Sequence, residues 1–171
     1  MRTVMACTGL GDLADRWAAL LREQVRALDV AMLDSVVPDA LRGLWSGLDS
    51  ERDLGGQTAT VYHFGVDGDG TSRAYAYRST AGFVSQPLPH GMFAKPMPAV
   101  SMTADDFADL GSMVALASRI RAEQAALPAG LGVRIGGELT LTQIDGRGLR
   151  VATVHRFDDF DAAWVGMHRE V

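Results

Sequence analysis

The histidines, the single lysine and the single cysteine are the side chains of this 171-residue chain best suited to catalysis or metal binding. The histidines are His63, His90, His155 and His168. No two of them have the spacing that places metal ligands on one face of a helix. His63 and His155 lie in segments with the alternation of a strand, so they could meet across a sheet and bind a metal with a carboxylate. The alternative is that both are ordinary packed or edge histidines.

The remaining candidates are His90, Lys95 and Cys7. His90 and Lys95 lie in a proline-rich segment, residues 85–101, of the kind that often forms a binding loop. A Schiff-base or general-base lysine needs a rigid, desolvated site, which such a segment does not offer. Cys7 lies in an apolar run without a neighbouring cation, which predicts a buried structural thiol. We keep His63, His90, Lys95 and His155 as candidates for a pocket or an interface, and assign no catalytic, cofactor-binding or metal-binding residue.

Two short motifs resemble ligand loops. The Gly-Leu-Gly segment at residues 9–11 follows a predicted strand and opens a predicted helix, as in a dinucleotide-binding loop, but no parallel strand follows at the required distance. The Asp-Gly-Asp-Gly segment at residues 67–70 resembles the start of a calcium loop, but its later acidic ligands are missing. We therefore predict a tight turn with a helix cap at the first and a hairpin turn at the second.

Aspartates cluster at residues 105–109 and 158–161. Both clusters fall near the predicted start of a helix, where negative charge is favoured by the helix dipole. Catalysis by paired carboxylates is the alternative, and it requires a cleft that a sequence does not show.

The elements that must position these residues follow from the hydrophobic pattern. We expect a strand at residues 3–8 and a helix at 13–28 capped by Asp12. A second helix is expected from Asp34 or Pro38 to Leu48, followed by a surface loop at 49–57.

Strand-like alternation begins at residue 58. The pattern predicts a hairpin of strands 58–66 and 72–80, with a possible short strand at 81–84. An irregular loop or exposed arm follows at 85–101. A long helix is expected from a capping box at Thr103 and Asp106 to about Leu127, then a hairpin of strands 131–144 and 149–157, and a short helix at 159–168.

This order of elements predicts an α+β fold in which antiparallel sheets pack with helices, in one of its forms a reduced four-layer αββα sandwich. We find no linker or repeat, so a single domain is expected over residues 1–171.

Composition limits the class of partner. The formal net charge is −5 and no run of like charges stands out, which disfavours nucleic-acid binding. No apolar stretch approaches the ~20 residues that span a bilayer, and the N-terminal apolar run is too short for a signal peptide. With one cysteine and no membrane segment, we expect a cytoplasmic protein that uses no cofactor.

The order of elements resembles the N-terminal-nucleophile hydrolases, especially the proteasome-β-like members. The segment Thr-Val-Met-Ala-Cys-Thr-Gly at residues 3–9 is similar to that fold's fourth strand leading into its first helix. The second helix, the hairpin at residues 61–77, the Gly-Phe pair at 82–83, the third helix and the Gly-Gly strand at 136–137 follow in a matching order. The resemblance implies two antiparallel sheets between helix layers over nearly the whole chain.

The resemblance lacks its catalytic part. Family members place a Thr, Ser or Cys nucleophile at a free N-terminus on an earlier strand, with a supporting lysine on a nearby strand. Thr3 is a poor substitute because exposing it would require cleavage after Arg2, and Lys95 lies in the proline-rich segment. We therefore expect a shortened, non-catalytic relative or a fragment whose upstream part lies elsewhere. Missing strands would leave a sheet edge open to a copy of the chain or a partner strand.

Three hypotheses follow. The first is a non-catalytic domain that self-associates or binds a protein partner, with the proline-rich arm as a candidate contact. The second is an N-terminal-nucleophile hydrolase that needs residues upstream of Met1. The third is a small-molecule binder or an enzyme of unknown reaction, with a pocket near His63, His90 and His155.

Overall fold

The computed structural model describes residues 3–92, 94, 98–99, 101–128, 131–132, 135–145 and 147–160. The chain divides into two compact units. The first runs up to Pro89 and includes Ile144–Leu149, and the second comprises His90–Gln143 and the residues from Arg150 on. Both units combine helices with antiparallel strands, so the predicted α+β class is confirmed. The single domain and the four-layer arrangement stay predictions.

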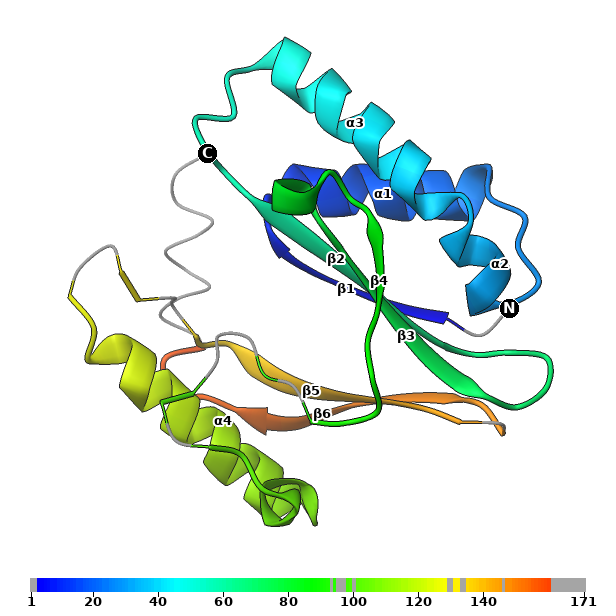
Figure 1. Cartoon of the computed structure of the whole chain (residues 1–171). Helices are drawn as coiled ribbons and strands as arrows, with labels where there is room; N and C mark the ends of the chain where they lie inside the picture. Colours follow the sequence, from blue (N-terminus) through cyan, green and yellow to red (C-terminus); the bar gives the residue numbers. More distant parts are fainter. Residues whose placement is uncertain are drawn as a thin grey trace. The chain divides into compact units, whose positions relative to one another are not determined.

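A four-stranded antiparallel sheet forms the base of the first unit, in the spatial order β1-β2-β3-β4 (Figure 1). The strands are β1 (Thr3–Gly9), β2 (Ala59–Val66), β3 (Ser72–Arg78) and β4 (Ser85–Pro87). In this register Cys7 lies opposite Val61, and Val61 lies opposite Tyr77. Because directly opposed residues share a face, these three side chains point to the same side of the sheet.

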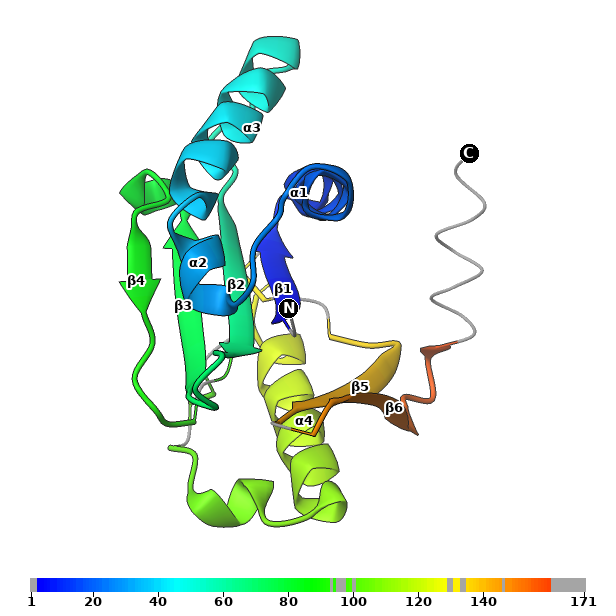
Figure 2. The ribbon, with the colours of Figure 1, turned by 90° about the vertical axis from the view of Figure 1, so that its right-hand side faces the viewer.

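Three helices between β1 and β2 cover that side of the sheet. They are α1 (Gly11–Glu23), α2 (Val30–Asp34) and α3 (Val37–Glu51). Viewed along its axis in Figure 2, α1 lies above β1, while α3 lies on the side of β2 and β3. Pro38 occupies the first turn of α3, as predicted, where its missing N–H is not needed.

The helix boundaries correct two predictions. The first helix ends at Glu23 rather than Leu28, and a short helix that we did not predict, α2, follows. Asp29 begins α2: its backbone is extended, and its side chain accepts from the backbone N–H of Met32 at 2.7 Å. Asp12 is not a cap: Leu10 holds the N-cap position, and Asp12 pairs instead with Arg52.

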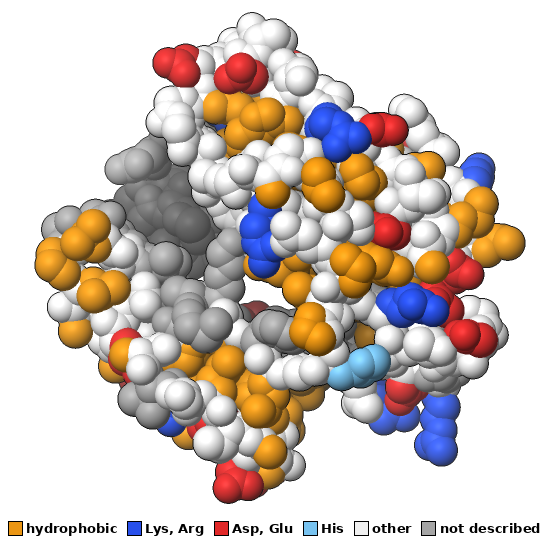
Figure 3. Space-filling model, viewed as in Figure 1, with side chains coloured by type: hydrophobic (Ala, Val, Ile, Leu, Met, Phe, Trp, Pro, Cys, Tyr) orange, Lys and Arg blue, Asp and Glu red, His pale blue; other side chains and the backbone are white. Residues whose placement is uncertain are grey.

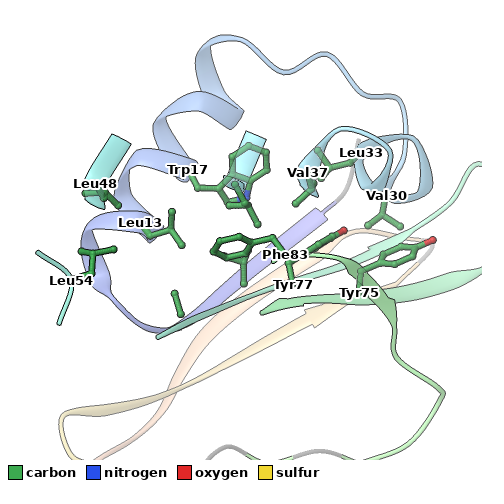
Figure 4. Packing of buried hydrophobic residues seen from close by; sticks show 13 residues of the cluster. Leu13, Trp17, Val30, Leu33, Val37, Leu48, Leu54, Tyr75, Tyr77 and Phe83 are labelled. Atoms are coloured by element: carbon green, nitrogen blue, oxygen red, sulfur yellow. The ribbon is translucent and has the colours of Figure 1, made fainter. Parts of the chain in front are cut away.

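The core of the first unit lies between these helices and the sheet (Figure 4). Its largest fully buried side chains include Trp17, Tyr77 and Phe83. On β2 the predicted alternation is confirmed: the face with Val61 and His63 is fully buried. Burial of a large apolar side chain stabilises a fold by about 1.5–3 kcal/mol, so this layer accounts for much of the unit's stability.

The strand expected at residues 81–84 is displaced. The chain forms a 3-10 turn, η1 (Ser79–Ala81), and β4 begins only at Ser85, inside the segment predicted to be irregular. Gly82 and Phe83 both adopt positive φ, 59° and 56°, which lies outside the β region of backbone conformation. The turn buries the Phe83 ring in the core, where its edge meets Trp45.

The second unit contains a 3-10 turn, η2 (Ala104–Phe107), and a helix, α4 (Leu110–Ala125). It also contains most of the antiparallel pair β5 (Glu138–Ile144) and β6 (Leu149–Arg156). The capping box of Thr103 and Asp106 is confirmed, but it begins η2 rather than the long helix. A second cap, Asp109, begins α4 by accepting from the Ser112 N–H at 2.8 Å.

Some predictions fall outside the described residues. These include Lys95, nearly all of the C-terminal helix expected at residues 159–168, and His168 within it. Among the described residues, no helix has both the length and the apolar character needed to cross a bilayer.

Candidate functional site

The most chemically distinctive residue of the first unit is His63, whose side chain is completely buried on β2. The indole N–H of Trp17, from α1, donates to His63 Nε2 at 2.9 Å, and the two rings stack with centroids 5.8 Å apart. The rings of Tyr77 and His63 form a T-shaped pair with their centroids 5.4 Å apart. Three elements, α1, β2 and β3, therefore fix the position of one imidazole.

This contact defines the protonation state of His63. Because Nε2 accepts the indole proton, the neutral ring carries its own proton on Nδ1. Nδ1 is buried and has no hydrogen-bond partner among the described residues. Burial lowers the pKa of His63 to about 4, against a weaker opposing effect of the Asp34 carboxylate. The ring is therefore neutral at physiological pH.

Asp34, at the end of α2, is the second polar group of this region. Its Oδ1 accepts from the hydroxyl of Tyr77 at 2.7 Å and from the hydroxyl of Ser85 at 2.5 Å. Tyr77 and Ser85 face each other on β3 and β4. One carboxylate oxygen thus joins a helix to two strands, and hydrogen bonds to a charged group are the stronger kind.

The same carboxylate changes the acidity of its neighbours. Burial raises the pKa of Tyr77 strongly, and the hydrogen bond to Asp34 raises it further, because ionising the phenol would place a second negative charge beside the carboxylate. The pKa of Tyr75 is also raised, first by burial and then by Asp34. Both tyrosines therefore hold their protons firmly, and Tyr77 acts as a hydrogen-bond donor rather than a base.

The hydrogen bonds of this cluster join helices to strands of the sheet. A nucleophilic serine needs a base such as histidine within hydrogen-bond reach, whereas Ser85 donates to an aspartate. His63 accepts a hydrogen bond from the indole N–H of Trp17, a group too weakly acidic to transfer its proton to a histidine base. Among the hydrogen bonds of the described residues, no nucleophile is paired with a histidine base. We interpret the cluster as the polar anchor that holds α1 and α2 on the sheet.

Cys7 agrees with the expected structural role. It is half-buried on β1 and packs against the core. Burial, with a smaller contribution from Asp15, raises the pKa of its thiol to about 11. A thiol that holds its proton so firmly is a weak nucleophile at neutral pH.

The other candidate residues lie apart in the chain. His63 belongs to the first unit and His155 to the second, where the edge of its ring meets Phe157 at 4.9 Å. His90 is exposed after β4. No group of three or more metal-ligating side chains occurs among the described residues. The predicted pocket near these histidines stays a prediction.

The second motif forms the predicted hairpin turn, whereas the first is a tight connection without the predicted side-chain cap. At residues 9–11, Gly9 has a φ of 91° and the chain passes directly into α1. In the second turn, the N–H of Thr71 bonds to Asp69, and Asp67 pairs with Arg73. Each aspartate is thus held by protein donors within the hairpin.

The aspartate clusters also have protein partners. Asp106 belongs to the capping box of η2 and Asp109 caps α4, and their carboxyl pKa values are lowered chiefly by bonds from the Thr103 and Ser112 backbone N–H groups. Asp159 pairs with Arg121 at 2.8 Å. These three aspartates therefore serve local structure.

The outer edge of β1 is a candidate site of a different kind. Among the described residues, β1 pairs with β2 alone. In an antiparallel ladder, residue pairs that exchange hydrogen bonds alternate with pairs that do not. The Leu10 N–H donates to the Thr58 carbonyl at 3.1 Å, so the residues of β1 that bond to β2 are the even-numbered ones. The backbone groups of Thr3, Met5 and Cys7 then point away from β2.

The opposite edge of the sheet is protected. β4 has only three residues. Just after it, and in the same register, the Leu88 N–H donates to the Ala74 carbonyl, so the even-numbered residues of this segment bond to β3. The outward positions therefore include Pro87 and the following Pro89, and proline has no N–H to offer. β1 has seven residues and contains neither proline nor a charged side chain. A long, uncharged edge without proline is unusual in a protein that stays monomeric.

The surface of the first unit also exposes apolar side chains at a four-residue spacing. They are Leu28, Met32 and Val36, of which Leu28 is 83% exposed. In Figure 3, hydrophobic side chains lie interspersed with acidic and basic ones. Nothing in the structure indicates what would cover this stripe.

Sequence reasoning missed Asp34, Ser85 and the role of Trp17. The sequence pattern marks Asp34 only as a possible helix start and Ser85 only as the first residue of the proline-rich segment. Their partners depend on the packing of α2, which has too few residues to show a helical period. No family model, no curated protein and no solved structure matches the chain.

Proposed function

We propose that this protein is a non-catalytic α+β domain that binds a protein chain by adding a strand to the outer edge of β1. One observation carries the proposal: among the described strands, β1 is an edge strand without proline or charge, whereas β4 ends the same sheet with proline. Unpaired backbone groups on an edge strand pair readily with another strand.

The position of β1 supports a stable interaction. The inner face of the strand is already packed against the core through Met5 and Cys7. Its backbone is therefore fixed before binding, so the conformational entropy lost on strand pairing falls mainly on the partner. Strand addition supplies affinity through main-chain hydrogen bonds and needs no deep pocket.

The lack of a nucleophile paired with a histidine base in the Asp34 and His63 cluster favours a binding role over catalysis. The net charge of −5 favours a protein partner over nucleic acid. The single cysteine, whose thiol is held protonated, is compatible with the cytoplasmic location that we include in the proposal.

A charged side chain on the edge tests the proposal. Ala6 is the exposed residue of β1 whose side chain points away from the helices. Ala6→Lys should weaken self-association or partner binding at least about tenfold, because lysine on an edge strand opposes pairing. The matched control is Ala31→Lys, which places the same charge on an exposed alanine of α2. Light scattering after size exclusion measures the assembly, and equal behaviour of the two variants would contradict the proposal.

A second candidate concerns the same edge. The resemblance to N-terminal-nucleophile hydrolases suggests that strands encoded upstream of Met1 could pair with β1 and supply the nucleophile. The observation that favours it is the position of β1 before the helices, at the outside of its sheet. The genomic sequence upstream of Met1 tests it: an in-frame strand led by Thr, Ser or Cys would support it, and an in-frame stop codon would exclude it.

A further inference from the structure

We infer that the strand added to β1 is the β1 strand of a second copy, paired antiparallel about a two-fold axis that passes between Ala6 and Ala6 of the partner subunit. This inference rests on the proposed function and names its partner. It would join two four-stranded sheets into one continuous sheet of two copies.

The first argument is the alternation of backbone groups along β1. Thr3, Met5 and Cys7 point their N–H and C=O groups outward, as the ladder with β2 requires. Pairing about Ala6 places Met5 of one copy opposite Cys7 of the other. The outward N–H and C=O groups of each residue then face those of its counterpart. Each such pair exchanges two hydrogen bonds, and Ala6 itself occupies a closely spaced pair without them.

The second argument is the length of the strand. β1 spans Thr3–Gly9, and its middle residue is Ala6. A two-fold axis at Ala6 pairs every residue of the strand with its counterpart. Axes at Met5 or Cys7 also join outward groups, but each leaves two residues of the described strand without a partner at one end. The register about Ala6 therefore forms the longest ladder.

The third argument is the chemistry of the side chains that would meet. Ala6 is exposed and small, so its approach to its own copy brings no steric conflict. Val4 would face Thr8 of the partner subunit, which is a favourable pair of β-branched residues. No residue of β1 is charged. Although each copy has a net charge of −5, pairing of the two β1 strands therefore brings no like charges opposite one another.

The fourth argument is the side of α1 that lies over this edge. Arg16 and Asp12 of α1 form ion pairs with Glu51 and Arg52 at the end of α3. At 100° per residue, the opposite flank of α1 contains residues whose side chains are small or apolar. These residues are Ala14, Ala18 and Leu21, each only half-buried. Their spacing of four and three residues is that of a seam between two helices.

Charge complementation tests the axis directly. Ala6→Lys and Ala6→Glu should each be monomeric, because each places two like charges opposite one another. An equimolar mixture of the two variants should restore the dimer, because lysine then faces glutamate. In any other register position 6 faces a different residue, and mixing restores nothing. Mass measurement by light scattering distinguishes these outcomes, with Ala31→Lys as the control that leaves the dimer intact.

A cross-link provides the second measurement. In the Cys7→Ser background, Ala6→Cys should form an intersubunit disulfide under mild oxidation, because opposed Cα atoms in a closely spaced pair lie about 4.5 Å apart. Wild-type Cys7, which would face Met5 of the partner subunit, should cross-link at least about tenfold more slowly.

The results separate the inference from the proposed function. A wild-type chain that stays monomeric at high concentration overturns the pairing with a second copy. A dimer that Ala6→Lys leaves intact overturns the use of the β1 edge as well. A dimer that Ala6→Lys abolishes, but that neither the mixture nor the cross-link recovers, retains the edge and overturns the axis at Ala6.

Discussion

The indole N–H of Trp17 donates to Nε2 of His63 at 2.9 Å, inside a core where both side chains are completely buried. This bond requires a neutral imidazole, because a protonated ring would present an N–H to the indole N–H. Trp17 comes from α1 and His63 from β2. The contact therefore links the protonation of one residue to the packing of a helix on the sheet.

The first prediction is a loss of stability in mild acid. The pKa of His63 is about 4 in the folded protein and 6.5 in the unfolded chain, so unfolding takes up a proton between these values. Stability is at its full value above pH 6.5 and falls as the pH drops to 4, by at most about 3 kcal/mol. Urea unfolding at several pH values measures it.

The matched variant is His63→Gln, which has no titrating group and keeps an acceptor for the Trp17 N–H. It should have a flatter dependence on pH between 6.5 and 4. If wild type and variant lose the same free energy over this range, His63 is not the group responsible.

The second prediction concerns Asp34. Asp34→Ala removes the acceptor of both the Tyr77 and Ser85 hydroxyls. We expect the free energy of unfolding to fall by about 2–4 kcal/mol, because two part-buried donors lose a charged partner. Tyr77→Phe and Ser85→Ala should each cost less, about 1–2 kcal/mol, since each removes one donor.

The control for Asp34 is Asp39→Ala on α3, which removes an exposed aspartate with a surface partner, Arg42. Its effect should stay within about 0.5 kcal/mol. Thermal unfolding compares the two alanine variants. Equal melting temperatures for them would show that Asp34 does not anchor α2.

The third prediction tests the turn between β1 and α1. Gly9 has a φ of 91°, and a Cβ added there would lie 2.0 Å from the Thr58 carbonyl oxygen. Gly9→Ala should therefore destabilise the protein by more than about 2 kcal/mol. Gly11→Ala is the control, because a Cβ at Gly11 meets no atom within 4 Å and alanine is the better helix former. A Gly9→Ala protein as stable as Gly11→Ala would contradict the geometry of this turn.

The fourth prediction concerns the reactivity of Cys7. Its pKa of about 11 leaves roughly a hundredfold less thiolate at pH 8 than an ordinary cysteine has. Reaction with a disulfide reagent should be slower by at least this factor in the folded protein than in urea. Ala6→Cys in the Cys7→Ser background is the exposed comparator. Rapid labelling of native Cys7 would show that the thiol is neither buried nor deactivated.

Periodicity correctly predicted several elements of the fold. The alternation at residues 58–66 and 72–80, with an Asp-Gly turn between them, correctly predicted the β2–β3 hairpin and placed Val61 and His63 on one face of β2, whereas the burial of that face became evident only in the structure. The capping box at Thr103 was also correct. These features depend on residues close together in the chain, so their signal is present in the sequence itself.

Boundaries and contacts over longer distances were not predictable in the same way. Nothing in the pattern before Asp29 shows that α1 ends at Glu23, because the apolar spacing continues to Leu28. The short helix α2 is held by burial of Val30 and Leu33 and by the bonds of Asp34, which require β3 and β4 to be in place. Tertiary contacts override weak local preferences in such segments.

The sequence by itself determined the α+β class, the β2–β3 hairpin, the low charge of the first strand and the absence of a recognisable catalytic motif. Only the tertiary structure decided that His63 accepts from Trp17, that Asp34 joins α2 to two strands, and that β1 lies at the edge of its sheet. The physical reason is that strand order and buried polar contacts join residues far apart in the chain. Neither is encoded in the local spacing of apolar residues.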